Sequence, residues 1–167
     1  METQIPNFLN GELFLLEARH FSDERFTGFI YREDINMVST KGRYALRVMI
    51  DLAKHQDEGY VPLKDIAERQ DISKKYLEII VKELVAGDMI IGVSGKGGGY
   101  CLSKKPSKYT VGSIIELMEG TLAPVACLKD ADYDCPRKKG CETLKMWKEY
   151  YKMTHSFFYG KKLTDLL

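Results

Sequence analysis

The sequence predicts a mainly α-helical chain with one small β-hairpin, arranged as a winged helix-turn-helix domain followed by a long C-terminal helix. Two amphipathic patterns joined by about three residues, the second longer than the first, are typical of a helix-turn-helix. Two β-prone runs around a glycine-rich loop follow at once and predict a hairpin, which in this position is a wing. A strongly aromatic helical pattern with heptad spacing fills the C-terminal region.

The 167 residues carry a formal net charge of +1, and the composition is that of a soluble globular protein. No apolar run is long enough to span a bilayer and no secretory signal is evident. We therefore expect a cytoplasmic protein with reduced thiols and no membrane partner.

Three segments differ in charge and pattern. Residues 1–36 carry 3 Lys/Arg against 7 Asp/Glu and have only weak periodicity. We expect them to be a loosely ordered arm or an extension from an upstream start codon, because strong periodicity begins only after Met37; a partner-docking arm is the alternative. Residues 37–108 carry 13 Lys/Arg against 9 Asp/Glu, which is compatible with a DNA-binding domain. Residues 109–167 hold a cysteine-rich segment and the long helix.

The first helix begins at Thr40, and Gly59 ends this unit. Its apolar residues recur at spacings of three and four. Pro62 then suits the first turn of a short helix that carries Leu63, Ile66 and Ala67. The expected apolar stripe of the first helix consists of Tyr44, Ala45, Leu46, Met49, Leu52 and Ala53.

The second helix of the helix-turn-helix is expected to begin after Ser73, a good N-cap, and to end at Gly87. Its exposed lysines can neutralise phosphates, and Glu78 can accept a hydrogen bond from a cytosine amino group in the major groove. The alternative is a solvated charged face. The expected buried positions are Leu77, Ile80, Val81 and Leu84, and the expected exposed positions are Lys74, Lys75, Glu78 and Lys82.

The β-prone runs Met89–Val93 and Tyr100–Leu102 enclose "SGKGGGY". This loop is not a phosphate-binding loop, because GxxxxGK[ST] is absent and a strand follows it. At a wing tip, its glycines would let the backbone approach the minor groove or its phosphates, with Lys96 as the cation. The alternative is a mobile hairpin tip.

Thr110 is expected to cap a further helix, with Val111, Ile114, Ile115 and Met118 on one face and an end near Gly120. The last helix carries a heptad seam that needs a partner surface, either its own domain or a second copy of the chain. The seam consists of Leu144, Trp147, Tyr151, Thr154 and Phe158.

The stretch "CLKDADYDCPRKKGC" contains Cys127, Cys135 and Cys141, three of the four cysteines. Structural zinc prefers cysteine pairs about two to four residues apart, whereas iron–sulfur clusters accept varied spacing. Nearby Lys and Arg residues would lower the thiol pKa values. A cluster site is favoured over zinc, a bare thiol switch or three unrelated cysteines. Cys101, in the wing strand, is expected to be a small core residue.

A thiol-dependent enzyme is the remaining alternative. It would need a general base near a nucleophilic cysteine. The three histidines, His20, His55 and His155, all lie more than ten residues from the cysteine trio. We therefore expect no enzyme.

The stretches "STKGRYALRVMIDLA", "VPLKDIAERQDISKKYLEIIVKEL", "VSGKGGGYCLSK" and "CLKDADYDCPRKKGCETLKMW" together resemble a family of bacterial winged-helix regulators. This is the iron–sulfur-sensing IscR family with its relatives NsrR, RirA and CymR, and the chain is most similar to IscR-like members. The resemblance covers Met37 to Leu167.

The resemblance implies a homodimeric transcription regulator that binds a palindromic DNA operator. It implies an iron–sulfur cluster, 2Fe–2S in preference to 4Fe–4S, on Cys127, Cys135 and Cys141, and it implies that the C-terminal seam forms the dimer. The expected DNA-binding residues are Ser73, Lys74, Lys75, Tyr76, Glu78, Lys82, Ser94, Gly95, Lys96, Gly97 and Gly98.

Two departures concern the fourth cluster ligand. Leu144 stands where IscR has a histidine, and Arg43 stands where NsrR has an aspartate. Glu142, a carboxylate from the partner, an external thiol or water would complete the site. Ser94 replaces the arginine of the IscR wing, so a different operator is expected. CymR-like members sense cysteine metabolism through a partner enzyme and without a cluster, and the cysteine trio argues against that branch.

Overall fold

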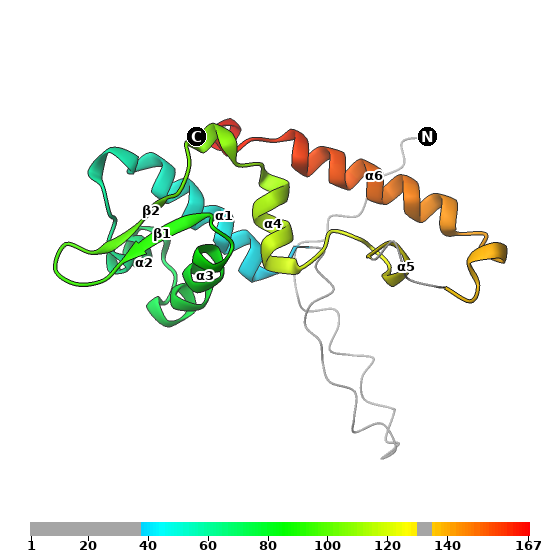
Figure 1. Cartoon of the computed structure of the whole chain (residues 1–167), viewed down its shortest axis with the longest axis horizontal. Helices are drawn as coiled ribbons and strands as arrows, with labels where there is room; N and C mark the ends of the chain where they lie inside the picture. The colour runs from blue at the N-terminus through cyan, green and yellow to red at the C-terminus, as the bar shows by residue number, and fades with distance from the viewer. Residues whose placement is uncertain (1–37, 130–134) are drawn as a thin grey trace, which may run out of the picture. The chain divides into compact units, whose positions relative to one another are not determined.

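The computed structural model describes residues 38–129 and 135–167. The expectation for residues 1–36 therefore lies outside the described residues. The helices are α1 (Thr40–Lys54), α2 (Leu63–Gln70), α3 (Lys74–Ala86), α4 (Val111–Glu119), α5 (Ala126–Lys129) and α6 (Leu144–Gly160), and the strands are β1 (Ile90–Val93) and β2 (Gly99–Leu102) (Figure 1). Short 3₁₀ turns lie at Gln56–Glu58, Pro106–Lys108, Lys138–Gly140 and Leu163–Leu166. The predicted fold class, mainly helical with one hairpin, is confirmed.

Helices α1, α2 and α3 enclose the larger apolar core. The four residues predicted to be buried in the second helix of the helix-turn-helix are the buried residues of α3. In α1, the buried set includes Met49 and Leu52 as predicted, and it also includes Val48 and Asp51. Tyr44 and Leu46 are only partly buried, because they lie at the edges of the stripe.

Local capping defines the turn between α2 and α3. Asp71 adopts a left-handed conformation with φ 50°, and its N–H bonds to the carbonyls of Ala67 and Glu68, which closes α2. The Ser73 hydroxyl accepts a hydrogen bond from the Tyr76 N–H at 3.3 Å, so Ser73 is the predicted N-cap of α3.

A buried polar cluster fixes α1 to α2. The carboxylate of Asp51, only 2% exposed, accepts hydrogen bonds from Arg69 Nε at 3.0 Å and Nη2 at 2.6 Å, and from Gln70 Nε2 at 2.9 Å. Burial alone would raise the pKa of Asp51. The hydrogen bonds from Arg69 and Gln70 and the charge of Arg69 outweigh burial and hold this pKa below its ordinary value.

The wing is an antiparallel hairpin in which Ile90 pairs with Leu102 and Gly92 with Tyr100. Its base is anchored to the segment before α2, because Val61 and Tyr100 exchange backbone hydrogen bonds of 2.9 and 2.8 Å. Gly99 makes this possible, since a Cβ there would meet the Val61 backbone. The strands begin and end within one residue of the predicted runs.

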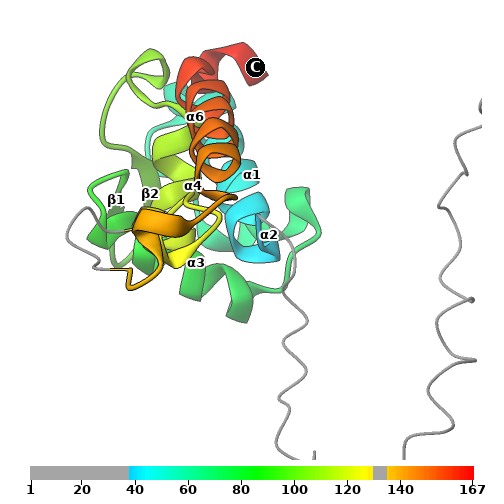
Figure 2. The same cartoon turned by 90° about the vertical axis from the view of Figure 1, so that its right-hand side faces the viewer.

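Helix α4 connects the larger apolar core to α6. Ile114 and Met118 pack into the larger core, whereas Val111 and Ile115 form a second cluster with Leu122. Tyr151, Phe158 and Tyr159 of α6 pack against that second cluster. Figure 2, which looks along α6, shows α4 directly beneath it. The predicted apolar face of α4 thus packs partly against the larger core and partly against α6.

The cysteine segment contains two short helical elements among its described residues. Cys127 lies in the four-residue helix α5, and a 3₁₀ turn precedes Cys141. These elements are too short to produce a periodic pattern in the sequence. Among the described helices, none is both long and apolar enough to cross a membrane.

Candidate DNA interface and cysteine site

The start of α3 offers a polar, cationic surface. Ser73, Lys74, Lys75, Glu78 and Lys82 are all exposed, on the sides of the helix away from its buried stripe. Side chains at these positions are free to reach phosphates or base edges of a duplex. The geometry is therefore compatible with the predicted readout face.

Tyr76 differs from its predicted neighbours. It is half-buried and packs against the core, with its ring edge-on to Tyr44 of α1 at a centroid distance of 5.8 Å. Lys41 of α1 and Glu83 of α3 form an ion pair at 3.0 Å between the same two helices. These contacts fix the orientation of α3 on α1, so a structural role for Tyr76 stands beside the predicted role in DNA binding.

A cleft of about 310 Å³ separates α3 from the wing. Glu78 and Lys82 lie on its helix side, and Gly92, Ser94 and Tyr100 lie on its wing side. Helix α3 and the wing therefore present polar groups to a shared concave surface. Ser94, which stands where a wing arginine was expected from IscR, belongs to this surface.

The wing tip is built by positive-φ glycines. Gly95 has φ 101° and Gly97 has φ 77°, and the Gly98 N–H bonds to the Gly95 carbonyl at 3.0 Å. Gly98 itself is restricted, because a Cβ there would meet the Val93 carbonyl oxygen. Lys96 is exposed between them. This tight turn holds one cation at the end of the hairpin.

Ile79 was not among the predicted site residues. Its side chain is 49% exposed on α3, although it is large, apolar and β-branched. Its spacing of four from Lys75 and three from Lys82 places it on the same side of the helix as those lysines. That spacing could have identified Ile79 as an exposed residue from the sequence. Ile79 was missed because it adjoins two buried apolar residues, Ile80 and Val81, and reads as part of the same apolar run.

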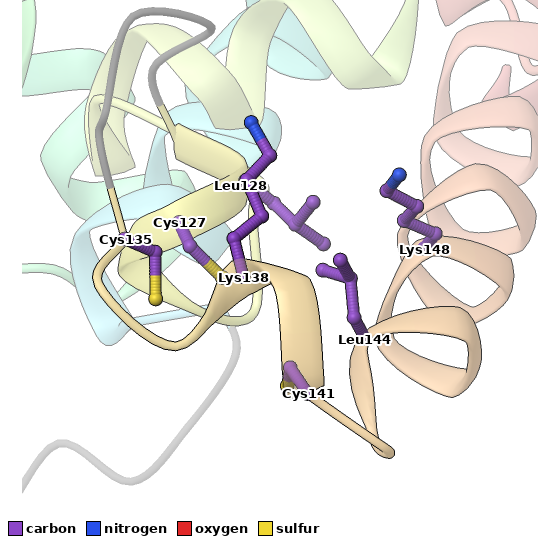
Figure 3. A pocket seen from close by; sticks show the side chains of 7 residues that line it. All are labelled: Cys127, Leu128, Cys135, Lys138, Cys141, Leu144 and Lys148. Atoms are coloured by element: carbon purple, nitrogen blue, oxygen red, sulfur yellow. The ribbon is translucent and has the colours of Figure 1, made fainter.

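The three predicted cysteine ligands line one cavity of about 270 Å³. They come from separate local segments: Cys127 from α5, Cys135 from the following loop, and Cys141 from the turn before α6 (Figure 3). The other lining residues are Leu128, Lys138, Leu144 and Lys148. Cys101 lies apart in β2, half-buried.

This donor set fits a thiolate-bound iron–sulfur cluster at three of four positions. The fit is incomplete in geometry: within residues 38–129 and 135–167, no three Cys, His, Asp or Glu side chains lie close enough together to hold a metal ion. The fourth position is also incomplete, because Leu144 lines the cavity, whereas Glu142 is exposed and not among the lining residues.

Cys141 is the cysteine whose ionisation is most directly assisted. Its Sγ lies 3.5 Å from Oγ1 of Thr143, and this hydrogen bond is the main reason that the pKa of Cys141 falls below its ordinary value. Backbone N–H groups of Thr143 and Leu144 act in the same direction. The beginning of α6 therefore favours a thiolate, which is the form that binds metals.

Helix α6 has no buried residue in the single chain, and the structure describes all of its 17 residues. The predicted seam residues are half-buried, and two of them, Tyr151 and Phe158, pack on the protein's own second cluster. A different stripe is more exposed: Met146 at 51%, Met153 at 64% and Phe157 at 59%. The packing on the protein's own domain that the sequence left open is therefore present for part of the seam.

A family model described as an iron-dependent transcriptional regulator, Rrf2, matches residues 38–167. The chain belongs to the Rrf2 family. It is 36% identical over 130 residues to the HTH-type transcriptional regulator IscR of Aliivibrio salmonicida, which covers 78% of this chain and 76% of that protein. The family resemblance inferred from the sequence motifs is confirmed.

Comparison with solved structures supports the same family. The global cysteine regulator CymR of B. subtilis is 36% identical, with a TM-score of 0.62 over 77% of this chain and 94% of CymR. T. potens IscR is also 36% identical, with a TM-score of 0.60 over 77% of this chain and 84% of that protein. The chain is thus a winged-helix, DNA-binding transcription regulator of the Rrf2 family and not an enzyme. Its relatives include both IscR and CymR, so the comparisons support two candidate regulatory signals.

Proposed function

We propose that this Rrf2-family regulator binds a palindromic operator as a homodimer and that an iron–sulfur cluster on Cys127, Cys135 and Cys141 controls the binding. The observation that carries the proposal is that three of the four cysteines line one cavity at the start of α6. When bound, the cluster would be a cofactor whose assembly depends on iron and whose stability depends on oxidants.

The cavity is well placed to influence the rest of the chain. Leu144 and Lys148, the first and second turns of α6, form one of its walls. Drawing the three thiols together would change how Cys141 lies relative to α5, and only Glu142 and Thr143 separate Cys141 from α6. Any such movement would change how α6 lies on α4.

Helix α4 relays that position to the DNA-binding core. Glu119, at its end, accepts hydrogen bonds from the N–H and hydroxyl of Ser39 at 3.0 and 2.8 Å, and Ser39 caps α1. Ile114 and Met118 pack into the same core as α3. A shift of α6 would thus alter the spacing of two recognition helices in a dimer, and half-sites must lie about one helical turn apart.

The homodimer is supported by the state of α6. An aromatic helix with no buried residue leaves apolar surface exposed to water, and a second copy would cover it. Symmetric pairing of two α6 helices would also match the symmetry of a palindromic site. The predicted seam and the stripe of Met146, Met153 and Phe157 together offer this surface.

Anaerobic purification tests the cluster. The wild-type protein should be brown and should contain iron and acid-labile sulfide. Replacing Cys127, Cys135 or Cys141 with Ser should remove the iron, whereas Cys101→Ser should keep it, because Cys101 lies in the wing strand. A colourless wild-type protein carrying one zinc would refute the cluster.

A second candidate is a cluster-free regulator that uses the same cysteines as a thiol switch or responds to cysteine metabolism. It is supported by the likeness to CymR and by the thiols not being gathered into a metal-binding set in the described residues. Iron-free protein should then bind its operator, and mild peroxide should change the affinity in wild-type protein but not in Cys141→Ser. Loss of operator binding on removal of iron would exclude it.

A further inference from the structure

Helix α3 carries two exposed large apolar side chains, Ile79 and Val85, and Ile79 is the one that lies among the predicted DNA-contacting residues near the start of the helix. A single exposed isoleucine is ordinary on a protein surface, so its position has to carry the argument. Ile79 is 49% exposed, whereas Ile80 and Val81 beside it are 0% and 2% exposed. It is also absent from the partly buried residues that pack against the larger core. About half of its apolar surface therefore remains open to solvent or to a ligand.

The surroundings of Ile79 match those of a duplex. Lys75 lies four residues before it and Lys82 three residues after it, and both are exposed, so cations border Ile79 along the helix axis. Glu78 and Lys82 also line the cleft that α3 shares with the wing. This arrangement is complementary to a DNA major groove, which has phosphates at its edges and base edges between them.

The chemistry of the side chain restricts what Ile79 can recognise. Isoleucine has no donor or acceptor, so it cannot take part in the hydrogen-bond code of base edges. Thymine is the one base that presents a methyl group in the major groove, and apolar side chains contact that methyl. The residue next to it, Glu78, is suited instead to a cytosine amino group.

We propose that Ile79 is a specificity-determining residue that packs against the C5-methyl group of a thymine in each operator half-site. This inference rests on the proposed function, in that α3 must enter the major groove. It adds a base preference that the charged residues of α3 cannot supply: Lys75 and Lys82 hold the backbone, Glu78 selects by hydrogen bonding, and Ile79 selects by an apolar contact.

The test removes the methyl group from the DNA and the side chain from the protein. An operator is first selected from random duplexes with wild-type protein. Each thymine is then replaced singly by uracil, which keeps the hydrogen bonds and lacks the methyl group. Wild-type affinity should fall about fourfold at one position per half-site, the effect of losing roughly one buried methyl contact. Ile79→Ala should bind more weakly and show no sensitivity at that position.

Ile91→Ala is the matched control, because Ile91 is 45% exposed but lies in wing strand β1. It should keep the wild-type pattern of uracil sensitivity. Ile79→Gln, which restores size without the apolar surface, should shift the selected base away from thymine.

The outcomes separate the two levels of the proposal. If no duplex is selected, operator binding itself fails. If a specific duplex is selected but no uracil substitution weakens binding, or if Ile79→Ala keeps the same sensitivity, the role of Ile79 is refuted. Circular dichroism of each variant confirms that the exposed substitution leaves the fold intact.

Discussion

Gly112 of α4 lies directly beneath the ring of Tyr159 of α6. A Cβ at position 112 would overlap the ring edge and lie within 2.7 Å of Tyr159 Cε2. The Tyr159 hydroxyl donates to the carboxylate of Glu116 one turn along α4, and its ring stacks on His155 at a centroid distance of 4.2 Å. Burial, followed by the carboxylate of Glu116, raises the pKa of Tyr159 to about 12, so the phenol remains a donor across the physiological range. The absence of a side chain at Gly112 thus sets how closely α6 can approach α4.

Gly112→Ala should therefore destabilise the protein. The added methyl group cannot fit against a ring that is held by Glu116 and His155, and overpacking of this kind costs about 1–3 kcal/mol of unfolding free energy. Chemical denaturation measures the change. Gly160→Ala is the control, because no heavy atom lies within 4 Å of a Cβ at Gly160. An unchanged stability for Gly112→Ala would mean that α6 moves freely on α4.

Asp51→Asn should remove a stability term that depends on pH. The pKa of Asp51 lies below its ordinary value of 3.8, so its stabilising effect is complete above about pH 4 and is lost as the pH falls through the folded-state pKa. At neutral pH, the loss of the charged partner of Arg69 should cost about 3 kcal/mol.

The measurement is the difference in unfolding free energy between wild-type protein and Asp51→Asn across the acid range. That difference should shrink below about pH 4. Asp57→Asn, a change of an exposed carboxylate on the next turn of chain, should alter stability by less than about 0.5 kcal/mol at every pH. A difference that stays constant down to low pH would show that the Asp51 charge does not stabilise the α1–α2 contact.

Local signals in the sequence were sufficient for the DNA-binding core. Ser73, Gly87, Thr110 and Gly120 cap the helices where predicted, because capping depends on a few neighbouring atoms. The buried stripe of α3 was predicted in full for the same reason: periodicity reports one face of one helix.

Features that depend on distant parts of the chain were not predictable. The buried Asp51 accepts hydrogen bonds from Arg69 and Gln70 on another helix, and no residue spacing in the sequence predicts that contact. The cavity shared by the cysteines depends on how α5 and the start of α6 approach each other. The sequence did not identify which face of α6 packs on the rest of the chain, because aromatic residues surround much of this helix. The packing of Tyr151 and Phe158 on α4 identifies that face.

Lys75→Ala and Glu78→Ala should affect operator binding in different ways. Loss of Lys75 should weaken binding to all duplexes alike and lower the slope of log affinity against log salt by about one, because one phosphate contact is lost. Loss of Glu78 should leave that slope unchanged and relax the base preference at one operator position. Lys54→Ala, a change of an exposed lysine at the end of α1, is the control and should do neither. The reverse pattern would mean that another face of α3 enters the groove.

Charge placed on the exposed stripe of α6 should separate the proposed dimer. Met153 and Phe157, 64% and 59% exposed, lie one turn apart, and a lysine at either position would bring two ammonium groups together across a symmetric interface. Light scattering during size exclusion should show the monomer mass for Met153→Lys at concentrations at which wild-type protein is a dimer, and operator affinity should fall because one half-site is lost. Ser156→Lys adds the same charge to an exposed position of α6 outside that stripe and should leave the dimer intact. Dimers that persist in Met153→Lys and Phe157→Lys would place the interface on the predicted seam of Leu144, Trp147 and Thr154 instead, where Trp147→Lys should then produce the monomer.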